Sequence, residues 1–260
     1  MPRLAMPVID IACASDPGQV RSQNEDSVVG DAEFGFAVLA DGMGGHNAGE
    51  VASRIATDLV SVGFRSDASL REGVDVPRAE TLVSAAVAAA NSAVLAAAGT
   101  SPRYRGMGTT LVLVLWHEAG VTYGHVGDSR LYLLRDGKLE RLTRDHSIVQ
   151  EQLDCGAITA EQARHAVNRN VLTRAVGIDP HVEADIRTIA IRRDDLYLLC
   201  SDGLTDMMTD DEIRQTLLAS GTDVRLAAGH LVELANEAGG HDNVSLILAR
   251  VVNVARQAGT

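Results

Sequence analysis

Aspartates stand at several points where an apolar segment of the chain ends in a turn. The clearest is Asp41, which follows the apolar run 36–40 and precedes the glycine-rich turn 42–45. A carboxylate in this position can bind a metal ion, and a glycine beside it lets a backbone carbonyl approach the same ion. A single aspartate at a strand end is more often a turn former. The interpretation therefore depends on the other junctions of this kind, which hold Asp128, Asp202 and Asp242.

Further oxygen donors accompany these four aspartates. Glu25 and Asp26 follow Arg21 in a polar segment, and Asp206 stands four residues after Asp202. Hard oxygen ligands favour magnesium, manganese or calcium, and the sequence has no cysteine or histidine cluster with zinc spacing. Two such ions about 3.5–4 Å apart can activate a water and stabilise an in-line displacement at phosphorus. Because an arginine can pair with two phosphate oxygens, the pattern indicates phosphomonoester hydrolysis.

The composition indicates a soluble globular protein and excludes several classes. Of the 260 residues, 46% are hydrophobic and 22% are charged, and the formal net charge is -12. Proteins that bind the nucleic-acid backbone normally carry a basic face, so we expect no nucleic-acid partner. Neither a dinucleotide fingerprint nor a P-loop is present. Three cysteines without a C-x-x-C pair fit a reducing cytosol, so we expect a cytoplasmic protein.

The N-terminus lacks the pattern of a signal peptide. The alanine-rich stretch 79–99 has about the length of a membrane span, but polar residues interrupt it. We therefore expect a packed helix there and no membrane segment in this chain.

Hydrophobic periodicity predicts the elements that position the acidic residues. Helices are expected at 48–64 and 77–98, and strands at 6–14, 28–29, 36–40, 106–116, 121–126, 130–134, 195–201 and 243–249. The hairpin signal Asp136-Gly137 and the other short connections imply an antiparallel sheet. The segment 145–170 is helical and polar, which is typical of an insertion that shapes a substrate site or of a surface subdomain. The length allows one large domain or two small ones.

Six short segments, taken together, resemble one known family over nearly the whole chain. They are Arg-Ser-Gln-Asn-Glu-Asp at 21–26, Ala-Asp-Gly-Met-Gly-Gly at 40–45, Gly-Thr-Thr at 108–110, Gly-Asp-Ser-Arg at 127–130, Ser-Asp-Gly at 201–203 and Asp-Asn at 242–243. Each is weak alone, but their order and spacing are specific. The chain resembles the bacterial type 2C (PPM-family) metal-dependent serine/threonine protein phosphatases.

This resemblance implies a fold and an activity. The expected fold is α+β: a four-layer α-β-β-α sandwich of two antiparallel sheets flanked by helices, with the site at one end between the sheets. Residues 1–260 would form one phosphatase domain, and 145–170 would be the variable flap of the family. The expected activity is hydrolysis of phosphoserine and phosphothreonine in proteins by a water that bridges two metal ions. The alternative is a non-catalytic regulator of the same fold that binds phosphoproteins.

The resemblance also assigns roles to individual residues. Two Mn2+ or Mg2+ ions are expected, with a possible third. Arg21 would hold the substrate phosphate, and Asp41 would bridge the two ions. The substrates would be phosphoproteins that include, or act downstream of, a serine/threonine kinase. The other expected ligands are the carbonyl of Gly42, Asp202 and Asp242 completing the shell of one ion, Glu25 through a water with Asp26 beside it, and Asp128, Asp202 and Asp206 at the third, weaker site.

The source of the leaving-group proton differs from the animal members of the family, which carry a histidine directly after the bridging Asp-Gly. This chain has Met43 there, and methionine cannot donate a proton. The candidates are His46 and a metal-bound water, and we favour the water. A haloacid-dehalogenase mechanism would need a second aspartate where Leu204 stands, and a cysteine phosphatase would need an arginine six residues after its nucleophile. The sequence fits neither.

Overall fold

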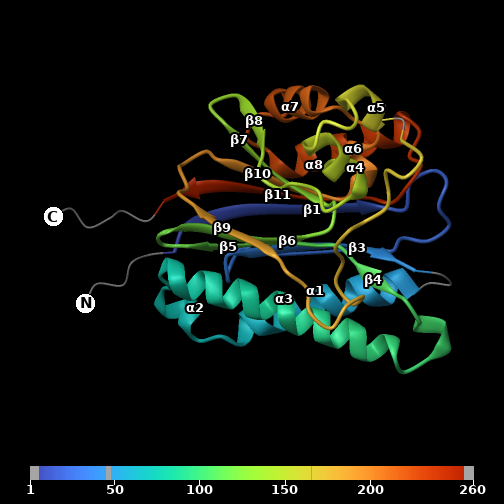
Figure 1. Cartoon of the computed structure of the whole chain (residues 1–260). Helices are drawn as coiled ribbons and strands as arrows, with labels where there is room; N and C mark the ends of the chain where they lie inside the picture. Colours follow the sequence, from blue (N-terminus) through green and yellow to red (C-terminus); the bar gives the residue numbers. More distant parts are fainter. Residues whose placement is uncertain (1–5, 45–47, 165, 255–260) are drawn as a thin grey trace.

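Two antiparallel sheets lie face to face between two layers of helices in the computed structural model, which describes residues 6–44, 48–164 and 166–254 (Figure 1). One sheet has the strand order β1-β11-β10-β7-β8, and the other has the order β2-β3-β5-β6-β9, with β4 paired to β3. The predicted α-β-β-α sandwich is confirmed. The strands are β1 (Val8–Asp16), β2 (Asp26–Asp31), β3 (Phe36–Met43), β4 (Gly108–Thr109), β5 (Leu111–His117), β6 (Gly120–Val126), β7 (Arg130–Arg135), β8 (Lys138–Arg141), β9 (Asp185–Ile189), β10 (Leu196–Cys200) and β11 (Val244–Asn253).

The helices divide between the two outer layers. The helices α1, α2 and α3 cover the sheet that contains β3, whereas α6, α7 and α8 cover the sheet that contains β11, with α4 and α5 beside them (Figure 1). A short 3-10 helix, η1 (Pro102–Tyr104), follows α3. The bounds are α1 (Ala48–Ser66), α2 (Ser69–Glu72), α3 (Val76–Ala98), α4 (Ile148–Asp154), α5 (Ala160–Arg164), α6 (Asp202–Thr205), α7 (Asp210–Ala219) and α8 (Val224–Glu237).

Three hydrophobic clusters fill the three spaces between the four layers. Between the sheets, Trp116 of β5 meets Tyr197 of β10 edge to face, with 5.8 Å between ring centroids. Under α1 and α3, Phe36 and Val60 belong to the second cluster, and Leu231 of α8 belongs to the third. Burial of such side chains is the main stabilising contribution to a sandwich of this kind.

The helix α3 is the one described helix that is long and apolar enough to cross a membrane by length and composition. Asp75 caps its N-terminus by accepting a hydrogen bond from the Arg78 N–H, and its buried positions, which include Val83, Val87 and Val94, pack into the cluster beneath it. One face of α3 therefore packs on the sheet, as expected of a packed helix, while 28% of its most apolar window is buried.

Several predicted boundaries change in the structure. The predicted strand 106–116 is divided into β4 and β5, with Thr110 between them. The strand predicted at 28–29 begins earlier, because Asp26 already pairs with Asp41 in the antiparallel ladder of β2 and β3. The predicted hairpin is confirmed: Asp136 and Gly137 join β7 to β8 with φ of 52° and 75°.

Candidate active site

A pocket of about 220 Å³ lies where β2, β3 and β11 meet the turns before β7 and α6. It brings together most of the residues that the sequence singles out. Asp206 is not in its lining, and neither is Asp26. The lining residues are Arg21, Glu25, Asp41, Gly42, Met43, Gly44, Thr110, Asp128, Asn170, Leu172, Asp202, Asp242 and Asn243.

The backbone of Asp41 is fixed from the neighbouring strands. Its N–H donates to Thr110 Oγ1 at 2.9 Å, and its carbonyl accepts from the Thr110 N–H at 2.8 Å and from Thr109 Oγ1 at 2.8 Å. Thr110 Oγ1 also shares a hydrogen bond of 2.7 Å with Ser129 Oγ, next to Asp128. The carboxylates of Asp41 and Asp128 are therefore carried on backbone segments that hydrogen bonds hold together.

Glycines let the backbone of β3 approach both β2 and α1. A Cβ on Gly42 would lie 2.1 Å from the carbonyl oxygen of Gly49 and 2.6 Å from that of Glu25. On Gly49, a Cβ would lie 2.7 Å from the Gly42 carbonyl and 2.8 Å from the carboxyl carbon of Glu25. Only glycine fits these positions, which keeps the Gly42 carbonyl and the Glu25 side chain close together.

The loop that carries Arg21 and Glu25 is held by one amide. Asn243 Oδ1 accepts from the Glu25 N–H at 2.8 Å, and its Nδ2 donates to the carbonyls of Gln23 and Pro17 at 2.8 and 3.0 Å. The sequence marks Asn243 as part of the Asp-Asn segment at 242–243 but gives no role for it. Its function in the structure is to attach this loop to the start of β11.

Arg21 and Asp242 pair with each other. Arg21 Nη2 donates to Asp242 Oδ2 at 2.7 Å, and this partner is the main reason that the pKa of Arg21 is raised. The Arg21 side chain is 53% exposed, so its guanidinium can also reach a ligand at the mouth of the pocket. The sequence assigns these two residues to phosphate and metal, and the structure places both in one pocket.

Burial and mutual repulsion disfavour the charged form of the clustered carboxylates. Burial raises the pKa of Asp26 to about 7 and that of Asp202 to about 6, and in both cases the negative charge of Asp242 adds to the effect. The pKa values of Asp41 and Asp128 are also raised well above the ordinary value, chiefly by burial and next by neighbouring aspartates. A divalent cation bound among these carboxylates would offset both the cost of burying their charges and the repulsion between them.

Asp26 does not line the pocket but pairs with Asp41, which does, in the ladder of β2 and β3. Ser201 Oγ donates to its Oδ2 at 2.9 Å, while its Oδ1 is buried without a hydrogen-bond partner. An orphaned carboxylate oxygen beside other carboxylates is the observation expected where a cation belongs, so this donor set fits a hard metal ion.

Within the described part of the chain, no three acidic, histidine or cysteine side chains already surround one point as ligands of a single ion.

Asp206 lies in a second cavity of about 870 Å³, which shares Asp128 and Asp202 with the first pocket. Its carboxylate forms an ion pair of 3.4 Å with Arg169 of the segment 145–170. Burial raises the pKa of Asp206, and the charge of Arg169 opposes this shift. The three residues expected at the third ion site thus border one cavity.

Met43 lines the first pocket, and no histidine of the described residues does so. His46, the histidine considered as a proton donor, lies outside the described residues.

Comparisons with known proteins identify the family. Residues 19–233 match the family described as protein phosphatase 2C. The serine/threonine protein phosphatase PstP of Mycobacterium tuberculosis is 41% identical over 248 residues, which cover 95% of this chain and 46% of that protein. The serine/threonine phosphatase Stp of Listeria monocytogenes is 35% identical over 237 residues, which cover 90% of this chain and 92% of that protein. The chain belongs to the protein phosphatase 2C family.

Solved structures show the same relationship. The catalytic domain of M. tuberculosis PstP, in complex with two manganese ions, superposes with a TM-score of 0.84 at 40% identity, covering 95% of this chain and 99% of that domain. Stp1 of Staphylococcus aureus superposes with a TM-score of 0.86 at 34% identity, covering 96% of this chain and 97% of the other. The chain spans about half the length of the full M. tuberculosis protein.

Proposed function

We propose that this chain is a metal-dependent protein phosphatase that hydrolyses phosphoserine and phosphothreonine in proteins. The observation that carries the proposal is the pocket in which Asp41, Asp128 and Asp202, all with raised pKa values, lie beside the half-exposed Arg21. Membership of the family and the manganese ions bound by M. tuberculosis PstP support it.

The ions would be two Mn2+ or Mg2+, with a third and weaker one beside them. When bound, such ions lower the pKa of water and stabilise negative charge on the attacking and leaving oxygens. Asp41 would bridge the pair. The other ligands would be Asp202, Asp242, the Gly42 carbonyl and, through water, Glu25 with Asp26 beside it, while Asp128, Asp202 and Asp206 would hold the third ion.

The residues of the chain perform the remaining tasks. Arg21 would move its planar guanidinium from Asp242 to two oxygens of the substrate phosphate, which orients the phosphorus for in-line attack. The hydrogen bonds from Thr110 and Thr109 fix the backbone of Asp41 before the substrate arrives, so little reorganisation is needed. Met43 cannot protonate the leaving oxygen, so a water molecule would supply that proton.

Residues 1–260 would form one catalytic domain, with the segment 145–170 as a flap beside the pocket. Asn170 of that segment lines the pocket, which supports its role near the substrate. We further propose a cytoplasmic signalling function, with phosphoproteins that include or follow a serine/threonine kinase as substrates.

Hydrolysis of a phosphothreonine peptide tests this proposal, with EDTA, magnesium and manganese compared at neutral pH. We expect turnover that requires added metal, and a loss of at least about 100-fold in Asp41→Asn, because even outer-shell changes at metal sites typically cost 10–100-fold. Asp58→Asn, an exposed change on α1, is the matched control.

Calorimetric titrations with Mn2+ and with the phosphopeptide, compared with turnover, separate the two candidate functions. A folded protein that binds manganese and the phosphopeptide without turnover would be a binding module, and the catalytic proposal would be wrong. Full activity of Asp41→Asn would contradict the assignment of the bridging ligand.

A further inference from the structure

The proposed reaction gives no role to the buried residues at the start of the flap, Asp145, His146 and Ser147. All three are buried, and the His146 side chain is only 2% exposed. They lie between β8 and α4, against the turn 127–130 that carries Asp128. Buried polar groups need partners, so the contacts of this segment show what it does.

His146 binds both polar groups of the Gly127 backbone. The backbone N–H of His146 donates to the Gly127 carbonyl at 2.8 Å, and its ring nitrogen Nδ1 accepts from the Gly127 N–H at 3.2 Å. Because Nδ1 accepts, the ring proton of the neutral side chain is on Nε2, which lies 3.4 Å from Asp185 Oδ2 and 3.3 Å from Arg174 Nη1. Together, the backbone N–H and the imidazole of His146 satisfy both polar groups of Gly127, as a neighbouring strand would do.

The same residue joins the two ends of the flap. Its carbonyl accepts from the Thr173 N–H at 2.8 Å, and the next residue, Ser147, forms a β-bridge with Leu172. One residue further, the Ile148 N–H donates to the Val171 carbonyl at 3.0 Å. The chain thus enters and leaves the flap through one short ladder that begins at His146.

Gly127 in turn contacts the segment that holds Asp41. It has a φ of 105°, and a Cβ there would lie 2.7 Å from Thr110 Cγ2. Thr110 Oγ1 accepts from the Asp41 N–H and pairs with Ser129. A continuous set of contacts therefore leads from the flap through His146 and Gly127 to both aspartates.

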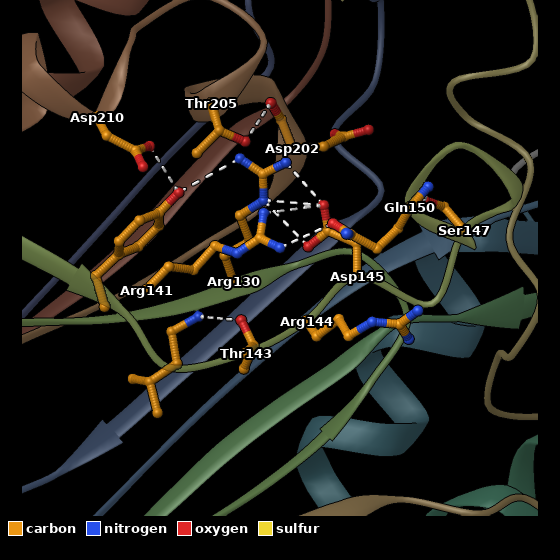
Figure 2. Close-up of polar contacts among 12 residues, drawn as sticks. Arg130, Arg141, Thr143, Arg144, Asp145, Ser147, Gln150, Asp202, Thr205 and Asp210 are labelled. Carbon is orange, nitrogen blue, oxygen red and sulfur yellow. Dashed lines mark hydrogen bonds and ion pairs between the residues drawn. The ribbon is translucent and has the colours of Figure 1, made fainter. Parts of the chain in front are cut away.

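A second contact fixes the other end of this turn. Figure 2 shows Arg130 facing Asp145, with Nε 3.1 and 3.2 Å from the two carboxylate oxygens and Nη2 2.7 Å from Oδ2. Arg141 also reaches Asp145 Oδ2, at 3.5 Å, and Tyr132 receives a hydrogen bond from Arg130 at 3.3 Å. The segments 127–130 and 145–147 are therefore held to each other at both ends.

We infer that His146 is a positioning residue whose Nδ1 hydrogen bond to Gly127 couples the order of the flap to the geometry of Asp128. When that hydrogen bond is lost, the turn before Asp128 and the base of the flap loosen together. Ion affinity at Asp128 then falls, and backbone amides in the flap exchange faster. The inference about ion affinity rests on the proposed role of Asp128 as a ligand, whereas the inference about the flap does not.

Two substitutions separate the hydrogen bond from the volume of the ring. In His146→Asn the amide oxygen lies near the position of Nδ1 and can still accept from Gly127, whereas in His146→Gln the amide lies near the position of Nε2. Asp185→Asn is the control that keeps the Nδ1 hydrogen bond and removes the negative charge beside the outer ring nitrogen, together with the 3.1 Å ion pair of Asp185 with Arg174. The measurements are Mn2+ titration by calorimetry and hydrogen–deuterium exchange of residues 148–164 in the metal-free protein.

We expect His146→Gln to weaken the lowest-affinity Mn2+ site by about 10–100-fold, the range typical of outer-shell partners, and to accelerate exchange in the flap. His146→Asn and Asp185→Asn should remain close to wild type in both measurements. Equal losses in His146→Asn and His146→Gln would show that the ring acts by filling space, and wild-type behaviour of His146→Gln would also overturn the inference. If wild type itself bound no manganese, the proposed metal centre would fail, and the exchange comparison would still decide the role of His146.

Discussion

At the scale of single residues, the site concentrates negative charge where the protein itself supplies little compensation. One oxygen of Asp26 is buried without a partner. The pKa values of Asp41 and Asp128 are raised by burial and by the negative charges of neighbouring aspartates. Such an arrangement opposes folding unless protons or cations are bound. Activity and stability should therefore respond to the same substitutions in opposite directions.

Asp41→Asn should stabilise the metal-free protein at neutral pH, although it abolishes the proposed bridge. Removal of one negative charge relieves the repulsion, and we expect a gain of at least about 1 kcal/mol, the equivalent of one pKa unit. Urea unfolding with EDTA at pH 7.5 measures it. With saturating Mn2+ the order should reverse, and a variant that is less stable than wild type in EDTA would contradict the charge argument.

Arg21→Ala should lower kcat/KM and leave the affinity for Mn2+ unchanged or higher. A hydrogen bond to a charged group contributes about 1.5–3 kcal/mol, so the loss should be roughly 10- to 150-fold. Because Asp242 loses its 2.7 Å partner, its carboxylate becomes free for an ion. Steady-state kinetics and calorimetry check both parts, and weaker Mn2+ binding would show that Arg21 orders the metal site instead.

Several carboxylates of the pocket could be singled out from the sequence because they belong to short local patterns, Asp-Gly after an apolar strand at 41–42 and 202–203 and Asp-Asn before one at 242–243. The residues that hold them could not, because their partners are remote in the chain. Asn243 binds the backbone of Glu25 across 218 positions, and Ser201 reaches Asp26 across 175. Such contacts depend on the assembled sandwich, which no local pattern contains.

At the scale of elements, the two glycines of α1 after its first residue stand in very different surroundings, and only Gly49 takes part in the packing of α1 against β3. Gly49 lies at the start of α1 against Gly42 and Glu25, whereas Gly63 lies near its end with nothing within 4 Å of a Cβ. The sequence predicts a helix here but cannot tell a glycine that permits close packing from one that does not.

Gly49→Ala should destabilise the protein by about 1–3 kcal/mol, the usual cost of overpacking, because its Cβ would lie 2.7 Å from the Gly42 backbone. Gly63→Ala on the same helix should stabilise it by up to about 1 kcal/mol, because alanine is the better helix former. Urea unfolding of both variants measures the difference. If the two had the same effect, close packing at Gly49 would not be the reason for its identity.

At the scale of the whole molecule, a histidine lies in the core between the two sheets. Both ring nitrogens of His125 on β6 are buried without partners, and its ring centroid is 4.8 Å from that of His146. Burial, followed by the nearby His146, lowers the pKa of His125 from 6.5 to about 4, with Asp145 and Asp185 opposing the shift. The folded protein therefore keeps this ring neutral in mildly acidic solution.

This depressed pKa predicts a loss of stability in acid. Between pH 6.5 and 4 the unfolded chain binds a proton that folded His125 does not, so the free energy of unfolding falls as pH is lowered, by up to about 3 kcal/mol. His125→Leu should remove that part of the pH dependence. Urea unfolding of both proteins from pH 7 to 4.5 tests it, since the carboxylates contribute equally to both. Parallel curves would contradict the prediction.

The antiparallel strands and the helices could be anticipated from the sequence because hairpins and amphipathic helices have local signals, whereas the four layers were expected only from the resemblance to a family. The order of the strands could not be anticipated, because β1 pairs with β11 from the other end of the chain, in a ladder from Val8 and Asn253 to Asp16 and Val244.

The ladder of β1 and β11 runs from the pocket end of the molecule to the opposite end. Asp16 and Val244 lie at the end near Asp242, whereas Val8 and Asn253 lie at the other end, at the side where both strands leave the sandwich (Figure 1). Ten residues of β11 span about 30 Å, which separates the two ends. A bead, sensor chip or fusion partner joined to either end of the described chain would therefore leave the pocket facing away from the attachment, where the proposed protein substrates can reach it.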